Sequence, residues 1–216
     1  MAWRSAVTFV ATILVILALA VLPLLSAPFV HAALDASGSA DLLGQDAAVT
    51  HDLSDRSVAE LVWGPGTFAF AGPDGAAFYD EAERRHLGDA RTLLWLLLLA
   101  GAVSGGLITL LFVTTQREMR PALWRAVSRA GATIAVVVIV VAAVGLVAFE
   151  PLFTLFHEVF FPGGGWAFDP ATQRLVQLYP FAFWQVAAAG FGLIALILGA
   201  AGWVLGRALA SPDADR

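Results

Sequence analysis

Four long apolar runs alternate with polar stretches along this chain of 216 residues. They lie at about 5–28, 92–115, 131–149 and 183–206. A helix needs about 20 predominantly apolar residues to cross the hydrocarbon core of a bilayer. The pattern therefore predicts an α-helical integral membrane protein with four transmembrane helices. The first run exceeds the apolar region of a cleaved signal peptide, which has about 7–15 residues, so we expect an anchor that stays in place, although residues 30–32 resemble a cleavage site.

The segment 30–91, between the first two runs, loses the apolar character and contains eleven of the seventeen acidic residues. A short amphipathic helix is predicted over 53–62. The Pro-Asp-Gly sequence at 73–75 is typical of a turn, and the short apolar segments 67–70 and 76–79 on its two sides are predicted as strands. We therefore expect a small cap of mixed α/β structure outside the bilayer.

A long helix is predicted to begin just before the second apolar run. Asp80, with Glu83 three residues later, is an Asp-type variant of the capping box that starts a helix. No helix breaker separates this start from the run at 92–115. His86 should therefore stand roughly 10 Å above the first residues in the hydrocarbon. Glu83 and Asp89, three residues before and after it, share its face of the helix.

Arginines are concentrated at positions that four spans place on one side of the membrane. They are Arg4, Arg117, Arg120, Arg125, Arg129 and Arg207. Short loops rich in arginine stay in the cytoplasm, so we expect the loop 116–130 and both termini there. The cap and the loop 150–182, between the third and fourth spans, then share the outer side.

Composition excludes several classes of protein. The chain is 59% hydrophobic and 13% charged, whereas soluble domains carry about 25% charged residues. It has no cysteine, and all twelve basic residues are arginines, which excludes thiolate and Schiff-base catalysis. The net charge of −5 argues against nucleic acid as a partner. The spans carry no charge apart from Glu150 at the end of the third, which disfavours a transporter.

The loop between the third and fourth spans contains the most unusual stretch of the chain. His157 and Glu158 lie among six phenylalanines, and three glycines at 163–165 and a turn at Asp169 follow. Desolvating an imidazole is costly unless it has partners. His157 is therefore either a catalytic group or held by a structural hydrogen bond to a loop carbonyl. The glycines either form a plain loop or close over a substrate and offer N–H groups to an oxyanion.

The predicted topology places His86 and His157 at one depth on the outer side, where they can cooperate. Alternatively, His86 is an interfacial histidine satisfied by Asp89. With Glu158 and Asp169, the two imidazoles are potential zinc ligands, but their spacing matches no ligand motif. We expect no metal and no other cofactor.

Two blocks of residues resemble a known family. The first comprises residues 83–86, from Glu83 to His86, together with Asp89. The second comprises Phe156, His157, Phe160, Phe161, Pro162, Trp166, Phe168, Asp169, Leu175, Leu178, Tyr179, Pro180, Phe183 and Trp184. In order and layout the chain resembles the bacterial four-span membrane proteins of the lipoprotein intramolecular transacylase (Lit) family.

The resemblance implies an acyltransferase in the bacterial cytoplasmic membrane that acts on a diacylated lipoprotein. A fatty acyl chain would move from the sn-2 ester of the diacylglyceryl-cysteine to the α-amino group of that cysteine, giving the lyso-form lipoprotein. A histidine of ordinary pKa suits deprotonation of an α-amino group, so His157 is expected to be the principal base and His86 to assist it. The supporting residues are expected to be Asp89, Glu158, Asp169 and Glu83. The aromatic residues expected at the substrate are Phe156, Phe160, Phe161, Trp166 and Tyr179.

Two other classes of function are consistent with the residues. One is a non-enzymatic membrane protein whose outer domain binds a lipid or a partner. The other is a related lipid hydrolase that uses the same histidines to activate water. A lipoprotein isomer of unchanged mass indicates transfer, released fatty acid indicates hydrolysis, and stabilisation by lipid without a product indicates binding. His31 and His51 lie in polar sequence without a clear partner, and we expect no catalytic role for either.

Overall fold

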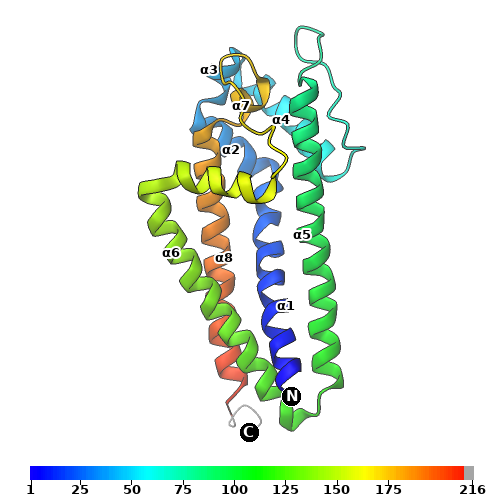
Figure 1. Ribbon diagram of the computed structural model, residues 1–216, viewed down its shortest axis with the longest axis vertical. Helices are drawn as coiled ribbons and strands as arrows, with labels where there is room; N and C mark the ends of the chain where they lie inside the picture. The colour runs from blue at the N-terminus through cyan, green and yellow to red at the C-terminus, as the bar shows by residue number, and fades with distance from the viewer. Residues whose placement is uncertain (212–216) are drawn as a thin grey trace. The chain divides into compact units, whose positions relative to one another are not determined.

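The computed structural model describes residues 1–211 (Figure 1). Its helices are α1 (Ala2–Val21), η1 (Leu22–Leu25), α2 (Ala27–Ser37), α3 (Ser39–Leu43), α4 (Ala47–Val62), α5 (Glu81–Thr114), η2 (Arg117–Met119), α6 (Arg120–Phe160), α7 (Arg174–Leu178) and α8 (Phe181–Leu209). Four helical segments are long and apolar enough to cross a membrane: Ala2–Leu25, Glu81–Thr114, Arg117–Phe160 and Phe181–Leu209. The predicted helical membrane protein with four spans is confirmed. The chain folds into two compact units, which are described separately.

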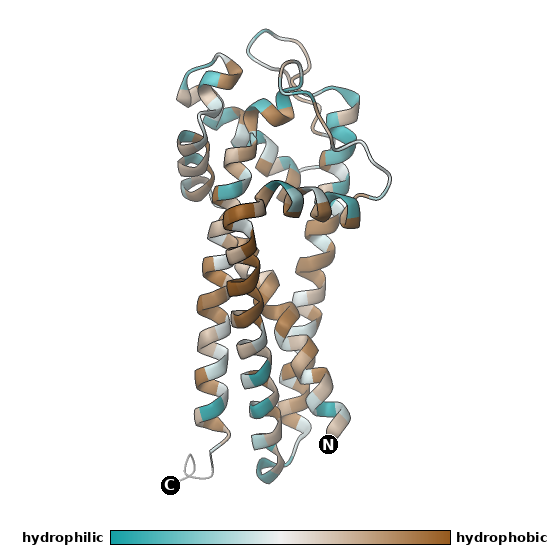
Figure 2. Cartoon of the chain, turned by 60° about the vertical axis from the view of Figure 1, so that its left-hand side comes forward, coloured by the Kyte–Doolittle hydropathy of each residue, from teal (hydrophilic) through white to brown (hydrophobic). Residues whose placement is uncertain are grey.

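The first unit is the apolar one. Within the described residues it comprises Met1–Leu22, Leu96–Val147 and the part of α8 from Gly190 onward. Small side chains let its helices pack closely, because a Cβ at Gly101 would meet the Cβ of Ala18 in α1, and one at Gly206 would meet the backbone at Ser128 in α6. Many of its valines and leucines are exposed, and Figure 2 colours much of these helices brown for hydrophobic residues. An exposed apolar surface of this kind is suited to lipid.

One end of this first unit gathers the arginines. Arg4 donates from Nη1 to Thr115 Oγ1 at 2.8 Å, and Arg120 donates from Nε to Thr115 O at 3.2 Å. Ser128 donates to Trp203 O at 3.0 Å. These hydrogen bonds hold together the start of α1, the end of α5, the start of α6 and the end of α8. The arginine-rich positions of the sequence therefore share one end of the unit.

The second unit comprises Pro23–Trp95 and Ala148–Ala189. Its core is built from apolar residues of α2, α4, α5 and α7 and of the segment between α4 and α5. Phe68 and Leu178 are fully buried there, and Tyr79 is 1% exposed. Two buried hydroxyl pairs stiffen this core: Ser54 with Tyr179 at 2.9 Å and Ser57 with Tyr79 at 2.8 Å. Both serines belong to α4. This helix is therefore bonded to Tyr79, which precedes the second span, and to Tyr179, which follows the third.

The predicted α/β cap is wrong, because residues 1–211 contain no strand. The turn at 73–75 forms, with Gly72 N donating to Ala76 O and Phe78 N to Phe70 O, but only one isolated antiparallel bridge, Ala71 with Ala77, results. The backbone N–H groups of Thr67 and Phe68 are instead taken by the carboxylate of Glu60. Phe68 also adopts a positive φ of 52°, which a strand does not permit.

Helices replace those strands as the structure of the cap. The helix predicted over 53–62 is longer, since α4 begins at Ala47, where Asp46 accepts a hydrogen bond from Val49 N at 2.8 Å as a side-chain N-cap. Helices α2 and α3, which precede it, were not predicted. Gly38 ends α2 with a left-handed backbone at φ 72°, a conformation that suits glycine.

Helix α6 carries a kink that places His157. The backbone leaves helical geometry at Ala148, with φ −144° and ψ 43°, three residues before Pro151. Proline lacks the N–H that would bond the preceding turn, and its ring clashes with that turn. The helix then continues to Phe160. The loop predicted over 150–182 is therefore helical in its first part, and His157 lies on a helix.

Candidate functional site

His157 lies in the last turn of α6 and has a defined hydrogen bond. Its Nδ1 is 2.8 Å from the backbone oxygen of Phe153, one turn earlier. A carbonyl oxygen can only accept, so Nδ1 must carry the hydrogen. In the neutral ring Nε2 then holds the free lone pair, which is what a base needs. The side chain is 8% exposed.

His86 comes from the other helix of the site, near the start of α5. Its ring is stacked on that of His157, with centroids 5.9 Å apart and planes at 26°. Within residues 1–211, hydrogen bonds are found at the other three histidines and none at the ring of His86. The structure thus brings together the two histidines that the topology had predicted at one depth.

Aromatic rings surround the histidine pair on several sides. Phe161 touches both rings, at 4.7 Å from His86 and 5.5 Å from His157. Phe153 lies 4.2 Å from His157, and Phe168 lies edge-on to His86 at 5.5 Å. An apolar surrounding disfavours a charged ring. The arrangement therefore favours neutral imidazoles, which can accept a proton.

The loop after α6 folds back over His157. Trp166 of this loop lies 4.9 Å from the His157 ring. Gly164 and Gly165 precede it with φ values of 72° and 76°, which glycine adopts without strain. A hydrogen bond from Gly164 N to Phe161 O closes the turn at 3.1 Å. The triple glycine thus lets the chain reverse so that Trp166 covers the histidine.

The predicted supporting carboxylates fall into two groups. Asp89 and Glu158 are exposed, and among the described residues neither forms a hydrogen bond with a histidine. Glu83 is buried and Asp169 is exposed, and they accept hydrogen bonds from the backbone N–H groups of Leu175 and Ala171, in the segment that follows the aromatic loop. Asp89 lies three residues after His86 and Glu158 directly follows His157, whereas the second group holds the backbone.

The predicted aromatic contacts also separate. Phe156 and Phe160 are 46% and 49% exposed, their ring centroids lie 4.9 Å apart with the planes tilted at 44°, and Phe156 is 5.4 Å from the His157 ring. Tyr179 lies in the core instead, where it packs against Phe183. Burial raises the pKa of Tyr179 to about 12. Because no aromatic contact joins Tyr179 to His86 or His157 in the described chain, we assign it to packing and no longer to the substrate.

Two site residues escaped the sequence reasoning. Phe153 supplies the carbonyl that sets the tautomer of His157, and Phe168 contacts His86. Phe153 lies four residues before His157, so the contact is predictable for a helix that continues past Pro151. From the sequence, the helix was predicted to end there. The second contact joins residues 82 positions apart and has no local signal.

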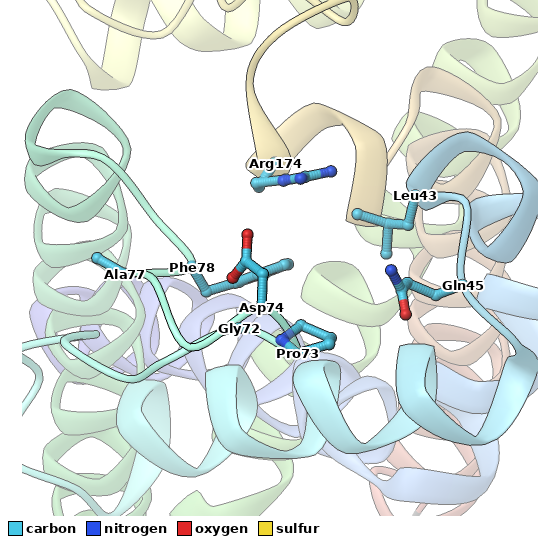
Figure 3. A pocket seen from close by; sticks show the side chains of 8 residues that line it. All are labelled: Leu43, Gln45, Gly72, Pro73, Asp74, Ala77, Phe78 and Arg174. Carbon is cyan, nitrogen blue, oxygen red and sulfur yellow. The ribbon is translucent and has the colours of Figure 1, made fainter.

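A separate hollow lies in the same unit (Figure 3). Arg174 of α7 and Asp74 of the turn face each other across it, with Leu43, Gln45 and Phe78 at its sides. Neither histidine of the stacked pair lines it. Among the described residues, no group of three His, Cys, Asp or Glu side chains is arranged to hold a metal ion.

Comparison with known proteins decides the family. The family model described as lipoprotein intramolecular transacylase Lit matches residues 6–184. The chain belongs to the Lit family. It is therefore an enzyme of the membrane with a lipoprotein transacylase role. No curated protein sequence matches it significantly.

Solved structures of Lit from Bacillus cereus share the fold. One matches with a TM-score of 0.81 at 17% sequence identity, over 96% of this chain and 94% of that chain. Two variants of that protein, in which a histidine is replaced by arginine or by alanine, match with a TM-score of 0.73 each. Their identities are 17% and 18%, over 96% of this chain and 90% and 92% of theirs. The Lit fold is thus retained at low sequence identity.

Proposed function

We propose that this Lit-family member moves a fatty acyl chain from the sn-2 ester of a lipoprotein's diacylglyceryl-cysteine to the α-amino group of the same cysteine. The observation that carries the proposal is the stacked pair of His86 and His157. His157 Nδ1 is engaged by the Phe153 carbonyl, so Nε2 is left as the basic nitrogen. No cysteine or lysine is available in the chain as a covalent nucleophile. In the proposed reaction the substrate's own amine is the nucleophile.

In the proposed reaction, His157 Nε2 takes the proton of the α-ammonium group. The free amine attacks the ester carbonyl carbon, a C–N bond forms, and the C–O bond to the glycerol sn-2 oxygen breaks. That first proton passes from His157 to solvent; the nitrogen of the tetrahedral adduct then gives its surplus proton to His157, which delivers it to the sn-2 oxygen as that oxygen leaves as a hydroxyl. The product has the same mass as the substrate. Because both reacting groups belong to one molecule, positioning supplies much of the acceleration.

His86 is proposed to assist this proton transfer or to stabilise the tetrahedral oxyanion. Among residues 1–211 no hydrogen bond fixes its tautomer, so either ring nitrogen can donate. Asp89, one turn later on α5, is proposed to contribute negative charge that supports the protonated ring. The exposed faces of Phe156 and Phe160 would lie against the acyl chains. Trp166 would exclude water from the ester, which favours aminolysis over hydrolysis.

The orientation in the membrane follows from the arginines. The positive-inside rule assigns the arginine end of the first unit to the cytoplasm, and an odd number of spans then separates it from the stacked histidines. We propose cytoplasmic termini and a site at the outer leaflet. Because the chain has no native cysteine, D74C should react with a membrane-impermeant maleimide in intact cells, and S211C only after the membrane is opened. The reverse pattern contradicts the orientation.

The function is tested with a synthetic lipopeptide whose N-terminal cysteine carries an S-diacylglyceryl group. The purified protein in lipid is expected to yield an isomer of unchanged mass whose amine is acylated. Release of free fatty acid in place of the isomer would assign the same histidines to a hydrolase. Binding of the lipopeptide with neither product would leave only the binding role and overturn the proposal.

A further inference from the structure

Two polar links join the first turn of α5 to the segment 169–175 that follows the aromatic loop. The first runs through Glu83, three residues before His86. Its Oε1 accepts a hydrogen bond from Leu175 N at 2.7 Å, and its Oε2 accepts one from Asp80 N at 2.7 Å. Asp80 in turn accepts from Glu83 N at 2.8 Å, which completes a capping box. One carboxylate therefore starts α5 and anchors α7.

The burial of Glu83 shows that this geometry is costly. The side chain is 1% exposed, and among the described residues no arginine or histidine forms an ion pair with it. A buried carboxylate without a cation is destabilising unless hydrogen bonds compensate it. Both of its oxygens are used as acceptors, one for each N–H group. An amide in this place could offer only one oxygen and would set a donor against the other N–H.

The second link runs through Gln173. Its Nε2 donates to Asp80 Oδ2 at 3.2 Å, and its Oε1 accepts from Asp169 N at 2.7 Å. Asp169 also closes its own turn by accepting from Ala171 N at 2.9 Å. The N–H of Glu83 lowers the pKa of Asp80 below its usual value. Asp80 is thus an ionised acceptor at neutral pH, and Gln173 connects it to the residue directly after Phe168.

These links hold the two sides of the histidine site together. One side is α5 with His86, and the other is the loop whose Phe161, Trp166 and Phe168 touch the histidine rings. Resting on the proposed function, we infer that Glu83 and Gln173 are positioning residues that keep this loop closed over the histidine pair. They act through the polypeptide and touch neither histidine.

The sharpest test exchanges donor and acceptor within the second link. Q173E keeps the size of the side chain and the contact with Asp169 N, but sets a carboxylate against that of Asp80. In D80N/Q173E the amide is at position 80 and the carboxylate at position 173. Position 80 then donates and position 173 accepts, so the hydrogen bond is restored in the opposite direction. The amide oxygen of D80N can still accept from Glu83 N, and the net charge equals that of the native chain. The double variant is therefore a matched rescue.

The readout compares the four histidines of the full-length protein in lipid. Diethyl pyrocarbonate acylates accessible neutral imidazoles, and peptide mass spectrometry gives the rate at each one. In Q173E the rates at His86 and His157 are expected to rise severalfold, while those at His31 and His51 stay unchanged as internal controls. D80N/Q173E should return both rates to the native value. Unchanged rates at His86 and His157 in Q173E would overturn the inference.

Turnover of the lipopeptide gives an independent second measurement. E83Q and Q173E should lower kcat about tenfold to a hundredfold, and D80N/Q173E should restore most of it. S54A, which removes a hydroxyl pair in the same core, serves as a control whose thermal stability falls while kcat is retained. If E83Q only loses stability as S54A does, Glu83 is structural and not positioning. If the native protein gives no isomer while the labelling pattern holds, the proposed function fails and the positioning stands.

Discussion

Two pairs of stacked histidines lie in the same unit, and their partners differ. His31 and His51 are 4.1 Å apart and parallel within 4°, and each Nε2 is 2.8 Å from an aspartate, Asp55 and Asp35 respectively. His86 and His157 are 5.9 Å apart, and no carboxylate is bonded to either ring in the described chain. Stacking is thus common to both pairs. What separates them is the partner of the rings: a carboxylate holds each ring of the first pair, whereas a backbone carbonyl holds His157 and aromatic rings surround the second pair.

The first pair is a cross-link between helices. His31 and Asp35 lie on α2, and His51 and Asp55 lie on α4, each four residues apart. Because each histidine bonds the aspartate of the other helix, the two helices run antiparallel, and the four side chains form a reciprocal clamp. A carboxylate fixes Nε2 as a donor, so this nitrogen is not available as a base. We propose a structural role for the clamp, because it joins α2 to α4 and no aromatic contact links it to His86 or His157 in the described chain.

The largest expected effect distinguishes the pairs directly. H157N keeps a side chain that can donate to Phe153 O, so the fold should survive, but it has no basic nitrogen. We expect kcat for the lipopeptide to fall about a thousandfold or more. H31N should leave kcat within experimental error of the native value. An H157N protein with native turnover would show that the open histidine pair is not the catalytic one.

A smaller loss is expected for the second member of the open pair. H86N should lower kcat about a hundredfold, because we propose that His86 assists and that His157 is the principal base. Residues that act as one unit are not additive. The double variant H86N/H157N should therefore be no slower than H157N alone. Multiplication of the two losses in the double variant would mean that the histidines act independently.

Part of this account was predictable from the sequence, and the rest depended on distant contacts. Apolar runs of bilayer length predicted the four spans. The span order and the arginines predicted that His86 and His157 lie on the same side of the membrane, and in the structure their rings are stacked. The predicted strands do not form, because the carboxylate of Glu60, seven residues before Thr67, accepts hydrogen bonds from backbone N–H groups that a β-ladder would use. The clamp has a visible repeat, His-x-x-x-Asp, but each histidine bonds an aspartate outside its own repeat.

The position of His157 shows a different limit. Pro151 is a helix breaker by local rules, so the sequence predicted a loop from residue 150 onward. In the structure the break is absorbed at Ala148, and the helix resumes. Only on a helix does the Phe153 carbonyl lie one turn below His157. The tautomer of the proposed base was therefore not accessible to sequence reasoning.

The two buried tyrosines of the core predict how the stability of the fold depends on pH, independently of the histidine site. Burial raises the pKa of Tyr179 to about 12 and that of Tyr79 well above its usual value. An unfolded tyrosine loses its proton near pH 10, so the unfolded state binds fewer protons above that pH. From pH 8 to about pH 10 the tyrosines should leave the unfolding free energy unchanged, and above that pH it should fall by at most about 1.4 kcal/mol per pH unit for each tyrosine.

Denaturant titrations between pH 8 and 12 measure this slope, and Y179F should make it shallower. The native hydroxyl pair with Ser54 is lost in Y179F, so its stability at pH 8 should be lower by about 1 kcal/mol. An equal slope in the native protein and in Y179F would show that the pKa of Tyr179 is the same in the folded and unfolded states, which contradicts the prediction. Turnover near neutral pH should not change, because Tyr179 is outside the histidine site.

The smallest effect is expected at the clamp. D35N/D55N removes both carboxylates that hold His31 and His51, and these pairs are partly exposed. Such pairs contribute about 0.2–1 kcal/mol each, so the unfolding free energy should fall by about 1 kcal/mol, with kcat unchanged. A loss of turnover comparable to that of H86N would mean that both histidine pairs serve the reaction.

The central claim is most directly tested by following the acyl chain itself. A diacylated lipopeptide with a deuterated acyl chain only at the sn-2 position is incubated with the native protein and with H157N, and the products are fragmented by tandem mass spectrometry. The account predicts that the native protein moves the label into the N-terminal amide fragment at unchanged total mass, and that H157N leaves it on the glycerol. Label found on the amine with H157N, or as free fatty acid with the native protein, would contradict it.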